Sequence, residues 1–180
     1  MRDEIRTDRL LLRPLRASDA EAMFAYRSDP DVAQFQGWEP PTLDGIRALI
    51  AEQENRAPDQ PGWSQLAIAE AATDTMLGGV AVRILSGDPR QAEIGFTLAR
   101  HAQRHGYATE AVRAVLGDLF FRRETHRVTA SVDPLNTRSI ALLERLGFRR
   151  EAHHVESLWV KGAWVDDVIF AVLRREWPLR

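Results

Sequence analysis

Cysteine is absent from the 180 residues of the chain, and this absence excludes several kinds of chemistry. Without thiols the protein has no disulfide, no thiolate metal site and no cysteine nucleophile. The absence of cysteine does not indicate whether the protein works in an oxidising or a reducing compartment. Lysine is nearly absent as well: Lys161 is the only one, which indicates a compositional bias and carries no functional argument.

Long apolar runs and runs of basic residues are also missing. No stretch approaches the ~18 consecutive apolar residues that a membrane span needs, and the first ten residues are charged rather than apolar. Acidic residues (26) and basic residues (24) nearly balance, which argues against a nucleic-acid binder driven by charge. We therefore expect a cytoplasmic protein that binds neither a membrane nor nucleic acid.

The length and the hydrophobic pattern predict one α/β domain over residues 1–180, because domains commonly run ~100–200 residues. Strands are expected at 9–15, 63–71, 76–85, 93–98, 125–132, 149–160 and 163–173. Helices are expected from Ser18, over 42–56, from about Gly106 and from Asn136. Strands lead into helices near the centre and pair as hairpins at both ends, so we predict a mixed, mostly antiparallel sheet of about seven strands with about four flanking helices.

The stretch 91–121 organises these elements, since it reads as a strand, a polar turn and a long amphipathic helix. In its strand, Ile94, Phe96 and Leu98 alternate with more polar or small residues, and Gly95 among these indicates a bulge or the close approach of a ligand. The turn that follows, Gln103–Thr109, has the features of an anion cradle. N–H groups at a helix start have no intrahelical acceptor, and Gly106 and Ala108 are small enough to let a phosphate approach them. The same residues also suit an ordinary loop.

This turn resembles the acyl-CoA-binding motif of the GNAT superfamily of N-acetyltransferases, in which Gln or Arg is followed by two residues, Gly, one residue, and Gly or Ala. Gln103, Arg104, Gly106 and Ala108 match that pattern. The segments TDRLLLRPLRASDAEAMF and VDPLNTRSIALLERLGFRREA resemble a branch with ribosomal-protein N-terminal acetyltransferases and some aminoglycoside acetyltransferases. The likeness covers nearly the whole chain.

The resemblance implies a GNAT-like fold whose two central strands, around Phe96 and Ala130, splay apart. Acetyl-CoA would lie in the opening as the co-substrate, with its pantetheine arm on the backbone of the first strand, and no metal is implied. The cofactor-binding residues expected on this basis are Phe96, Thr97, Leu98, Gln103, Arg104, His105, Gly106, Tyr107, Ala108, Thr109, Asn136 and Ser139.

The proton donor for the departing thiolate is less clear from the sequence. In much of the superfamily it is a tyrosine, but counting from Asn136 that position holds Leu143. Ser139 carries the nearest hydroxyl and is our candidate, with Asn136 bonding pantetheine. Alternatively, Asn136 is a plain helix cap, and Ser139 is a first-turn residue or binds without donating a proton.

Two carboxylates are candidates for the base that deprotonates an amine. Glu156 comes first, because its position between Val155 and Leu158 predicts partial burial, which would make it a better base. Glu93 comes second and could act through water. Either could instead be a surface carboxylate or an ion-pair partner. His153 and His154 are neighbours on a strand and face opposite ways, so we do not expect them to share a metal ion.

The resemblance thus implies an acetyl-CoA-dependent N-acetyltransferase that transfers directly to a primary amine, since no cysteine is available to carry the acetyl group. The amine is a protein N-terminus or a small molecule, and Trp38 and Glu39 are candidate acceptor contacts. A catalytically silent acyl-CoA-binding or sensory module and an unrelated nucleotide-phosphate binder are the alternatives. The aromatic residues Trp159, Trp164 and Trp177 further predict a homodimer, or else pack in the core.

Overall fold

The computed structural model describes residues 4–38, 41–56 and 60–177. Its strands are β1 (Ile5–Arg6), β2 (Leu10–Pro14), β3 (Gly62–Glu70), β4 (Met76–Ile84), β5 (Gln91–Leu98), β6 (Arg127–Val132), β7 (Arg149–Val160) and β8 (Ala163–Leu173). Its α-helices are α1 (Ala20–Ser28), α2 (Pro30–Ala33), α3 (Leu43–Asn55), α4 (Tyr107–Gly117) and α5 (Thr137–Arg145). None of these described helices is long and apolar enough to cross a membrane.

The strands form one mixed sheet in the order β1-β2-β3-β4-β5-β6-β8-β7, which confirms the predicted α/β class. Within the described residues β5 and β6 make the only parallel pair. The sheet has one strand more than predicted, and there is one more helix. The additions, β1 and α2, span two and four residues, too short to show a periodic pattern. Asp29 and Pro30 both end α1, whose last residue is Ser28, and begin α2, since Asp29 caps α2 and Pro30 is its first residue.

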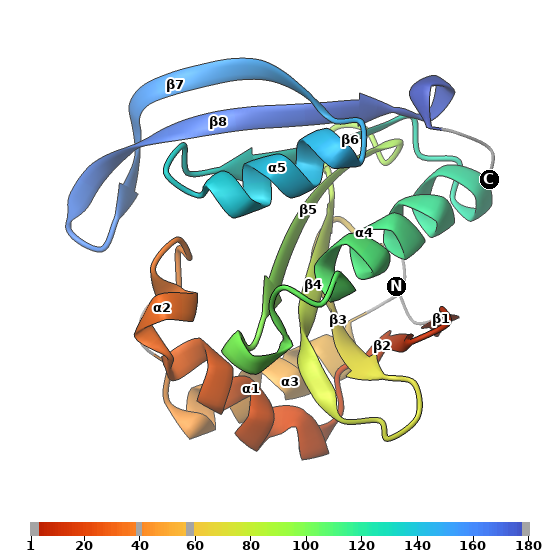
Figure 1. Ribbon diagram of the computed structural model, residues 1–180, viewed down its shortest axis with the longest axis vertical. Helices are drawn as coiled ribbons and strands as arrows, with labels where there is room; N and C mark the ends of the chain where they lie inside the picture. The colour runs from red at the N-terminus through yellow and green to blue at the C-terminus, as the bar shows by residue number, and fades with distance from the viewer. Residues whose placement is uncertain (1–3, 39–40, 57–59, 178–180) are drawn as a thin grey trace.

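Helices cover both faces of the sheet (Figure 1). The larger core packs α4 and α5 against alternate residues of β2 to β6 and β8, such as Ile94, Val128 and Ala130. A smaller core packs α1 and α3 against Ala67, Met76 and their neighbours on the opposite face. Polar residues of β5 and β6 that alternate with the larger core, including Glu93, therefore face away from α4 and α5.

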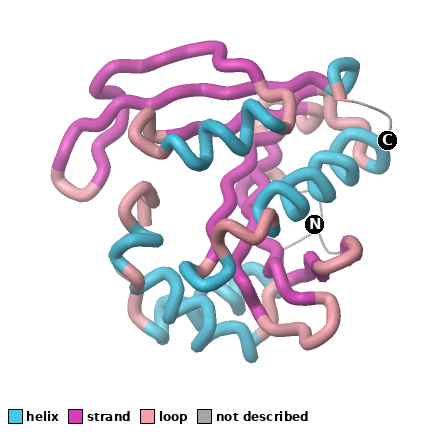
Figure 2. The backbone as a smooth tube through the Cα atoms, viewed as in Figure 1, coloured by secondary structure: helices cyan, strands magenta, loops and turns pink. Residues whose placement is uncertain are grey.

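The sheet divides between β5 and β6, as the resemblance implied. The two strands pair over only three positions, from Gln91↔Arg127 to Glu93↔Thr129, although β5 continues to Leu98 and β6 to Val132. Figure 2 shows β5 running down the middle of the molecule, while β6, β8 and β7 cross above it. One edge of β5 therefore stays without a partner strand beyond Glu93.

The predicted bulge at Gly95 is wrong, because β5 pairs with β4 in unbroken register from Ala92 to Leu98. The irregularity lies one strand further, where the pairing of β3 and β4 shifts between Ile68 and Ala69. Gly78 on β4 is the glycine that close packing requires, since a Cβ there would lie 2.2 Å from the carbonyl oxygen of Thr97. A Cβ on Gly95 would meet nothing within 4 Å.

At the C-terminal hairpin, the positive φ angles of Lys161 and Gly162 form the tight turn that we predicted. Trp159 and Trp164 pack edge to face with ring centroids 5.4 Å apart, and both are exposed. Trp177 is buried against Phe120, at 5.8 Å between centroids, so its expected part in a dimer is replaced by core packing. The homodimer prediction now depends on the hairpin alone.

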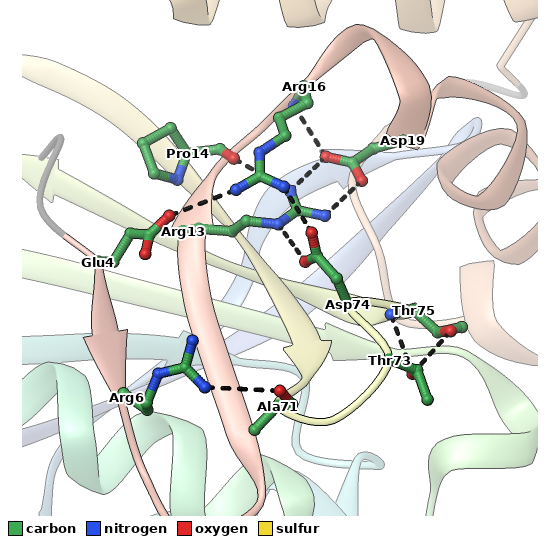
Figure 3. Close-up of polar contacts among 10 residues, drawn as sticks. All are labelled: Glu4, Arg6, Arg13, Pro14, Arg16, Asp19, Ala71, Thr73, Asp74 and Thr75. Carbon is green, nitrogen blue, oxygen red and sulfur yellow. Dashed lines mark hydrogen bonds and ion pairs between the residues drawn. The ribbon is translucent and has the colours of Figure 1, made fainter.

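A buried arginine ties the first strand region to the β3–β4 turn (Figure 3). Arg13 is 2% exposed and donates two hydrogen bonds, 2.8 and 2.9 Å long, to the carboxylate of Asp19, plus one of 2.6 Å to Asp74. Arg16 reaches the other oxygen of Asp74 from a half-exposed position. The two arginines thus share a partner but differ in burial.

We expect Arg13→Met to lower the free energy of unfolding by about 3–5 kcal/mol, because removing one partner of a buried ion pair leaves the other charge uncompensated. Arg16→Met is the matched control and should cost about 0–1 kcal/mol, as exposed pairs do. Urea denaturation of both variants measures the difference. Equal losses would show that the burial of Arg13 contributes nothing special.

Candidate active site

A cavity of about 850 Å³ opens where β5, α4, α5 and α2 approach one another. Its lining includes all but one of the residues expected to bind the cofactor: Phe96, Thr97, Leu98, Gln103, Arg104, Gly106, Tyr107, Ala108, Thr109, Asn136 and Ser139. These residues come from two parts of the sequence, 96–109 and 136–139. The structure therefore brings the predicted loop, strand and helix start around one space.

The first turn of α4 faces this cavity with unpaired backbone donors. Gly106 begins the helix with a φ of 81°, a left-handed conformation that favours glycine. No side chain caps the helix, and the first N–H group to bond back is that of Glu110, to the Gly106 carbonyl at 3.1 Å. The N–H groups of Tyr107, Ala108 and Thr109 precede it. They and the positive end of the helix dipole suit a phosphate.

Arg9 holds this loop from the side away from the cavity. Its guanidinium donates to the His105 carbonyl at 3.0 Å, binds the Glu110 carboxylate at 2.7 Å, and lies 4.7 Å from the centre of the Tyr107 ring. The loop is thus fixed before any ligand arrives. His105 itself does not line the cavity, because its ring stacks on Tyr107 at 5.7 Å. The sequence had placed His105 among the charged groups of the cradle.

Two arginines of α5 line the cavity and were missed by the sequence reading. Arg138 donates to Gln103 and Arg145 to Thr109, each at 3.4 Å, so Arg138 reaches from α5 to the loop before α4 and Arg145 reaches the first turn of α4 itself. With Arg104 they place three guanidinium groups around the space. Their spacing of seven residues places them on one face of the helix, but nothing near them in the sequence relates that face to the cavity.

The free edge of β5 offers backbone groups to the same cavity. Successive residues of a strand direct their N–H and C=O groups to opposite edges. The Ala92 carbonyl accepts a hydrogen bond, 3.3 Å long, from the Thr129 hydroxyl of β6. The backbone groups of Ala92 therefore point to the edge of β5 that lies next to β6. Because every second residue points to the same edge, the N–H groups of Phe96 and Leu98 also point to this edge, beyond the place where β6 separates from it. The Leu98 carbonyl is already bound by the Gln103 amide at 3.2 Å.

At the start of α5, Asn136 both caps the helix and lies at the cavity, the two alternatives that the sequence left open. The Asn136 side chain caps the helix by accepting from the Ser139 N–H at 3.1 Å, yet both residues line the cavity. Within the described residues no hydrogen bond involves the Ser139 hydroxyl. Leu143, at the position of the superfamily's tyrosine, is fully buried in the core. Thr137 and Ser139 are therefore the hydroxyl-bearing residues of α5 that line the cavity, and Ser139 is the one that the sequence predicted.

Glu93 lies at the last paired position before β5 and β6 separate, opposite Thr129. Its side chain is 22% exposed and lies 3.5 Å from the guanidinium of Arg83 on β4. Burial raises the pKa of Glu93 above its ordinary value of 4.5, while the Arg83 charge opposes this rise. Thr97, four residues further along the same face of β5, lines the cavity, whereas Glu93 itself is not part of the lining.

Glu156 does not have the environment that we predicted. Its side chain is exposed and does not line the cavity, and it sits at an irregular position of β7 with a φ of 46°. The pairing of β7 with β8 shifts between His154 and Leu158, so the alternation that predicted its burial fails there. His153 pairs with Asp166 at 2.6 Å. The described residues contain no cluster of three or more His, Asp or Glu side chains that could hold a metal ion.

The α2 segment forms the remaining rim of the cavity and separates it from Trp38. Val32 and Phe35 line the cavity, whereas Trp38 lines a second hollow beside Ala33 and packs its ring against Arg27, 4.5 Å from the guanidinium carbon. The structure thus places Trp38 behind the rim, not in the cavity. Glu39, the other candidate acceptor contact, lies outside the described residues.

Comparisons with known proteins agree with this geometry. The family described as Acetyltransferase (GNAT) domain matches residues 9–149. The uncharacterized N-acetyltransferase p20 of Bacillus licheniformis is 30% identical over 171 residues, which cover 95% of this chain and 96% of that protein. The ribosomal protein uS5-alanine N-acetyltransferase of Escherichia coli is 30% identical over 94 residues, about half of each chain.

The crystal structure of a GNAT-family acetyltransferase from Bacillus anthracis superposes with a TM-score of 0.88 at 26% identity, covering 97% of this chain and 100% of that one. The family match spans most of the chain and contains the loop before α4, the free edge of β5 and the start of α5. The chain therefore belongs to the GNAT acetyltransferase domain family and is an acetyltransferase.

Proposed function

We propose that the protein transfers an acetyl group from acetyl-CoA directly to a primary amine, within one ternary complex and one domain spanning residues 1–180. The observation that carries this proposal is the single cavity that joins the unpaired N–H groups at the start of α4, the free edge of β5 and the Ser139 hydroxyl. Acetyl-CoA would supply an activated acyl group as a thioester. Direct transfer follows because the chain has no cysteine to hold that group.

The residues of the cavity suit the parts of acetyl-CoA. The first turn of α4 and the guanidinium groups of Arg104, Arg138 and Arg145 would bind its phosphates, since charge-assisted hydrogen bonds to phosphate are the strong ones. The N–H groups of Phe96 and Leu98, on the free edge of β5, would hold the pantetheine arm and polarise the thioester carbonyl.

Two side chains would then move protons. Glu93 would take a proton from the acceptor amine, directly or through water, and its raised pKa makes it a better base near neutral pH than an ordinary glutamate. The Ser139 hydroxyl would give a proton to the departing thiolate. With its exposed side chain away from the cavity, Glu156 becomes the second choice for the base.

The acceptor is either a protein N-terminus or a small-molecule amine. The Escherichia coli relative is by its name an alanine N-acetyltransferase of ribosomal protein uS5, which supports a protein acceptor, but the match spans only about half of that enzyme. We place the discriminating contacts along α2 and the β7–β8 hairpin, which meet where Lys161 donates to the Ala33 carbonyl at 2.5 Å. We also propose that the exposed Trp159 and Trp164 contribute to a homodimer.

A catalytically silent acyl-CoA-binding module is the second candidate, and a specific observation favours it. Leu143 occupies the place of the superfamily's usual acid and is buried, so that position contributes no proton. In this case the cavity would bind acetyl-CoA without turning it over.

Release of CoA thiol from acetyl-CoA, measured with a panel of amines, tests the proposal. The panel should include peptides with free N-termini, the same peptides with blocked N-termini, and small polyamines. We expect thiol release that depends on a free amine and stops when the N-terminus is blocked. Binding of acetyl-CoA without release by any amine would favour the silent module, and binding of ATP in preference to acetyl-CoA would favour a nucleotide binder.

A further inference from the structure

Among the described residues, three aspartates are buried, and one of them lacks a cationic partner. Asp19 pairs with Arg13 at 2.8 Å, and Asp118 pairs with Arg122 and Arg123 at 2.9 and 2.7 Å. Asp167, 7% exposed, accepts instead from the Ser131 hydroxyl at 2.7 Å. A buried carboxylate without a nearby cation is costly to keep charged, and such groups gather at functional sites.

The position of Asp167 connects this carboxylate with Glu93. Ser131 on β6 pairs with Ile169 on β8, so Asp167, two residues along, lies on the same face as Ser131. Glu93 pairs with Thr129 and lies on that face too. Ser131 is exposed, which shows that the face is open to solvent beside the point where β5 and β6 part. An amine could approach Glu93 from this side.

We propose that Asp167 is a positioning residue that acts through Glu93. The Asp167 carboxylate, oriented by the hydrogen bond from the Ser131 hydroxyl, makes the Glu93 carboxylate a stronger base than the ion pair with Arg83 would leave it. The inference deepens the proposed function, because it assumes that Glu93 deprotonates the acceptor.

The charges around Glu93 act in opposite directions. Burial has the largest effect on the pKa of Glu93 and raises it; Arg83 lowers it, and the charge of Asp167 raises it again. On β6, Arg127 is engaged by Glu151 and so is not aimed at Glu93. His154 of β7 lies opposite Asp167 and is the remaining titratable group beside it.

The test compares the pH dependence of kcat/KM in two variants whose effects have opposite signs. A base must be deprotonated to act, so activity falls as the pH drops through the pKa of Glu93. This fall in activity is the acidic limb of the pH profile. Asp167→Asn should move the limb to lower pH, because the substitution removes a negative charge while the side chain keeps nearly the same shape. Arg83→Gln should move the limb to higher pH. The plateau rate of Asp167→Asn should fall by less than the roughly 10²-fold or more expected for loss of a general base.

Three controls separate the possible outcomes. Glu93→Gln should abolish the limb. In carbon-13 NMR, the carboxyl signal that is missing in Glu93→Gln identifies Glu93, and this signal should titrate at lower pH in Asp167→Asn than in the unchanged protein. In a His154→Asn background, Asp167→Asn should still move the limb to lower pH and Arg83→Gln should still move it to higher pH. If Glu93→Gln keeps the wild-type limb, the base of the proposed function is wrong. If the limb belongs to Glu93 but does not move in Asp167→Asn, the inference about Asp167 is overturned.

Discussion

Ala108→Asp is expected to abolish acetyl-CoA binding while leaving the protein folded. Ala108 is the second residue of α4 and lines the cavity, so a carboxylate there would compete with a phosphate for the same N–H groups. Two like charges ~4 Å apart repel by about 4 kcal/mol at an effective dielectric constant of ~20, which corresponds to a roughly 10³-fold weaker affinity. The helix itself should be stabilised slightly, since an acidic residue in its first turn complements the dipole.

Ala108→Asn is the matched control, because asparagine has nearly the same shape without the charge. Calorimetric titration with acetyl-CoA should show a much smaller loss for asparagine than for aspartate. Equal losses in the two variants would mean that size, not charge, excludes the ligand. Unchanged affinity in Ala108→Asp would place the phosphates elsewhere. Gly106 is a poorer choice, because a Cβ there would lie 3.4 Å from Arg9 and a carboxylate could pair with that guanidinium.

Ser139→Ala is expected to lower kcat by at least about 10²-fold, the lower end of what general acid catalysis contributes. Proton donation to the thiolate matters in the transition state, so the affinity for acetyl-CoA should change much less. Steady-state kinetics and direct binding measure the two quantities separately. The acceptor must be one for which chemistry, not product release, limits turnover.

A purely binding role for Ser139 predicts another pattern. Loss of one neutral hydrogen bond costs about 0.5–1.5 kcal/mol, roughly tenfold at most, and would appear mainly in KM. Ser139→Thr is a useful control, because it keeps a hydroxyl at the same place and should retain more activity than alanine. A Ser139→Ala enzyme with near-normal kcat would remove the residue from catalysis and leave water as the proton source.

The loop before α4 could be predicted because its signals are local, whereas the division of the sheet was expected only from the family resemblance. A strand, a small-residue turn and an amphipathic helix follow one another within 91–121, and the structure keeps that order. The residues that the sequence missed act over long distances. Arg9 supports the loop from β1–β2, and Arg138 and Arg145 reach it from α5, so nothing near them in the sequence marks their role.

The wrong predictions have the same origin. Burial of Glu156 was inferred from its apolar neighbours, but the irregular pairing of β7 leaves the side chain exposed. Asp167 showed no signal, since Asp166-Asp167 reads as a polar step within a strand, and only the fold buries the second carboxylate beside Ser131. For Trp177 the sequence allowed an interface or the core, and the structure shows it in the core against Phe120.

A single-turnover reaction with acetyl-CoA labelled in its acetyl group tests the central claim most directly. Enzyme in excess, acetyl-CoA and an amine acceptor found in the panel are mixed, and mass spectrometry follows the label on the acceptor and on the protein. We predict that the label moves to the amine in step with the release of CoA thiol, while the protein stays unlabelled throughout. Label that appears first on the protein, or thiol release without an acetylated amine, would contradict direct transfer.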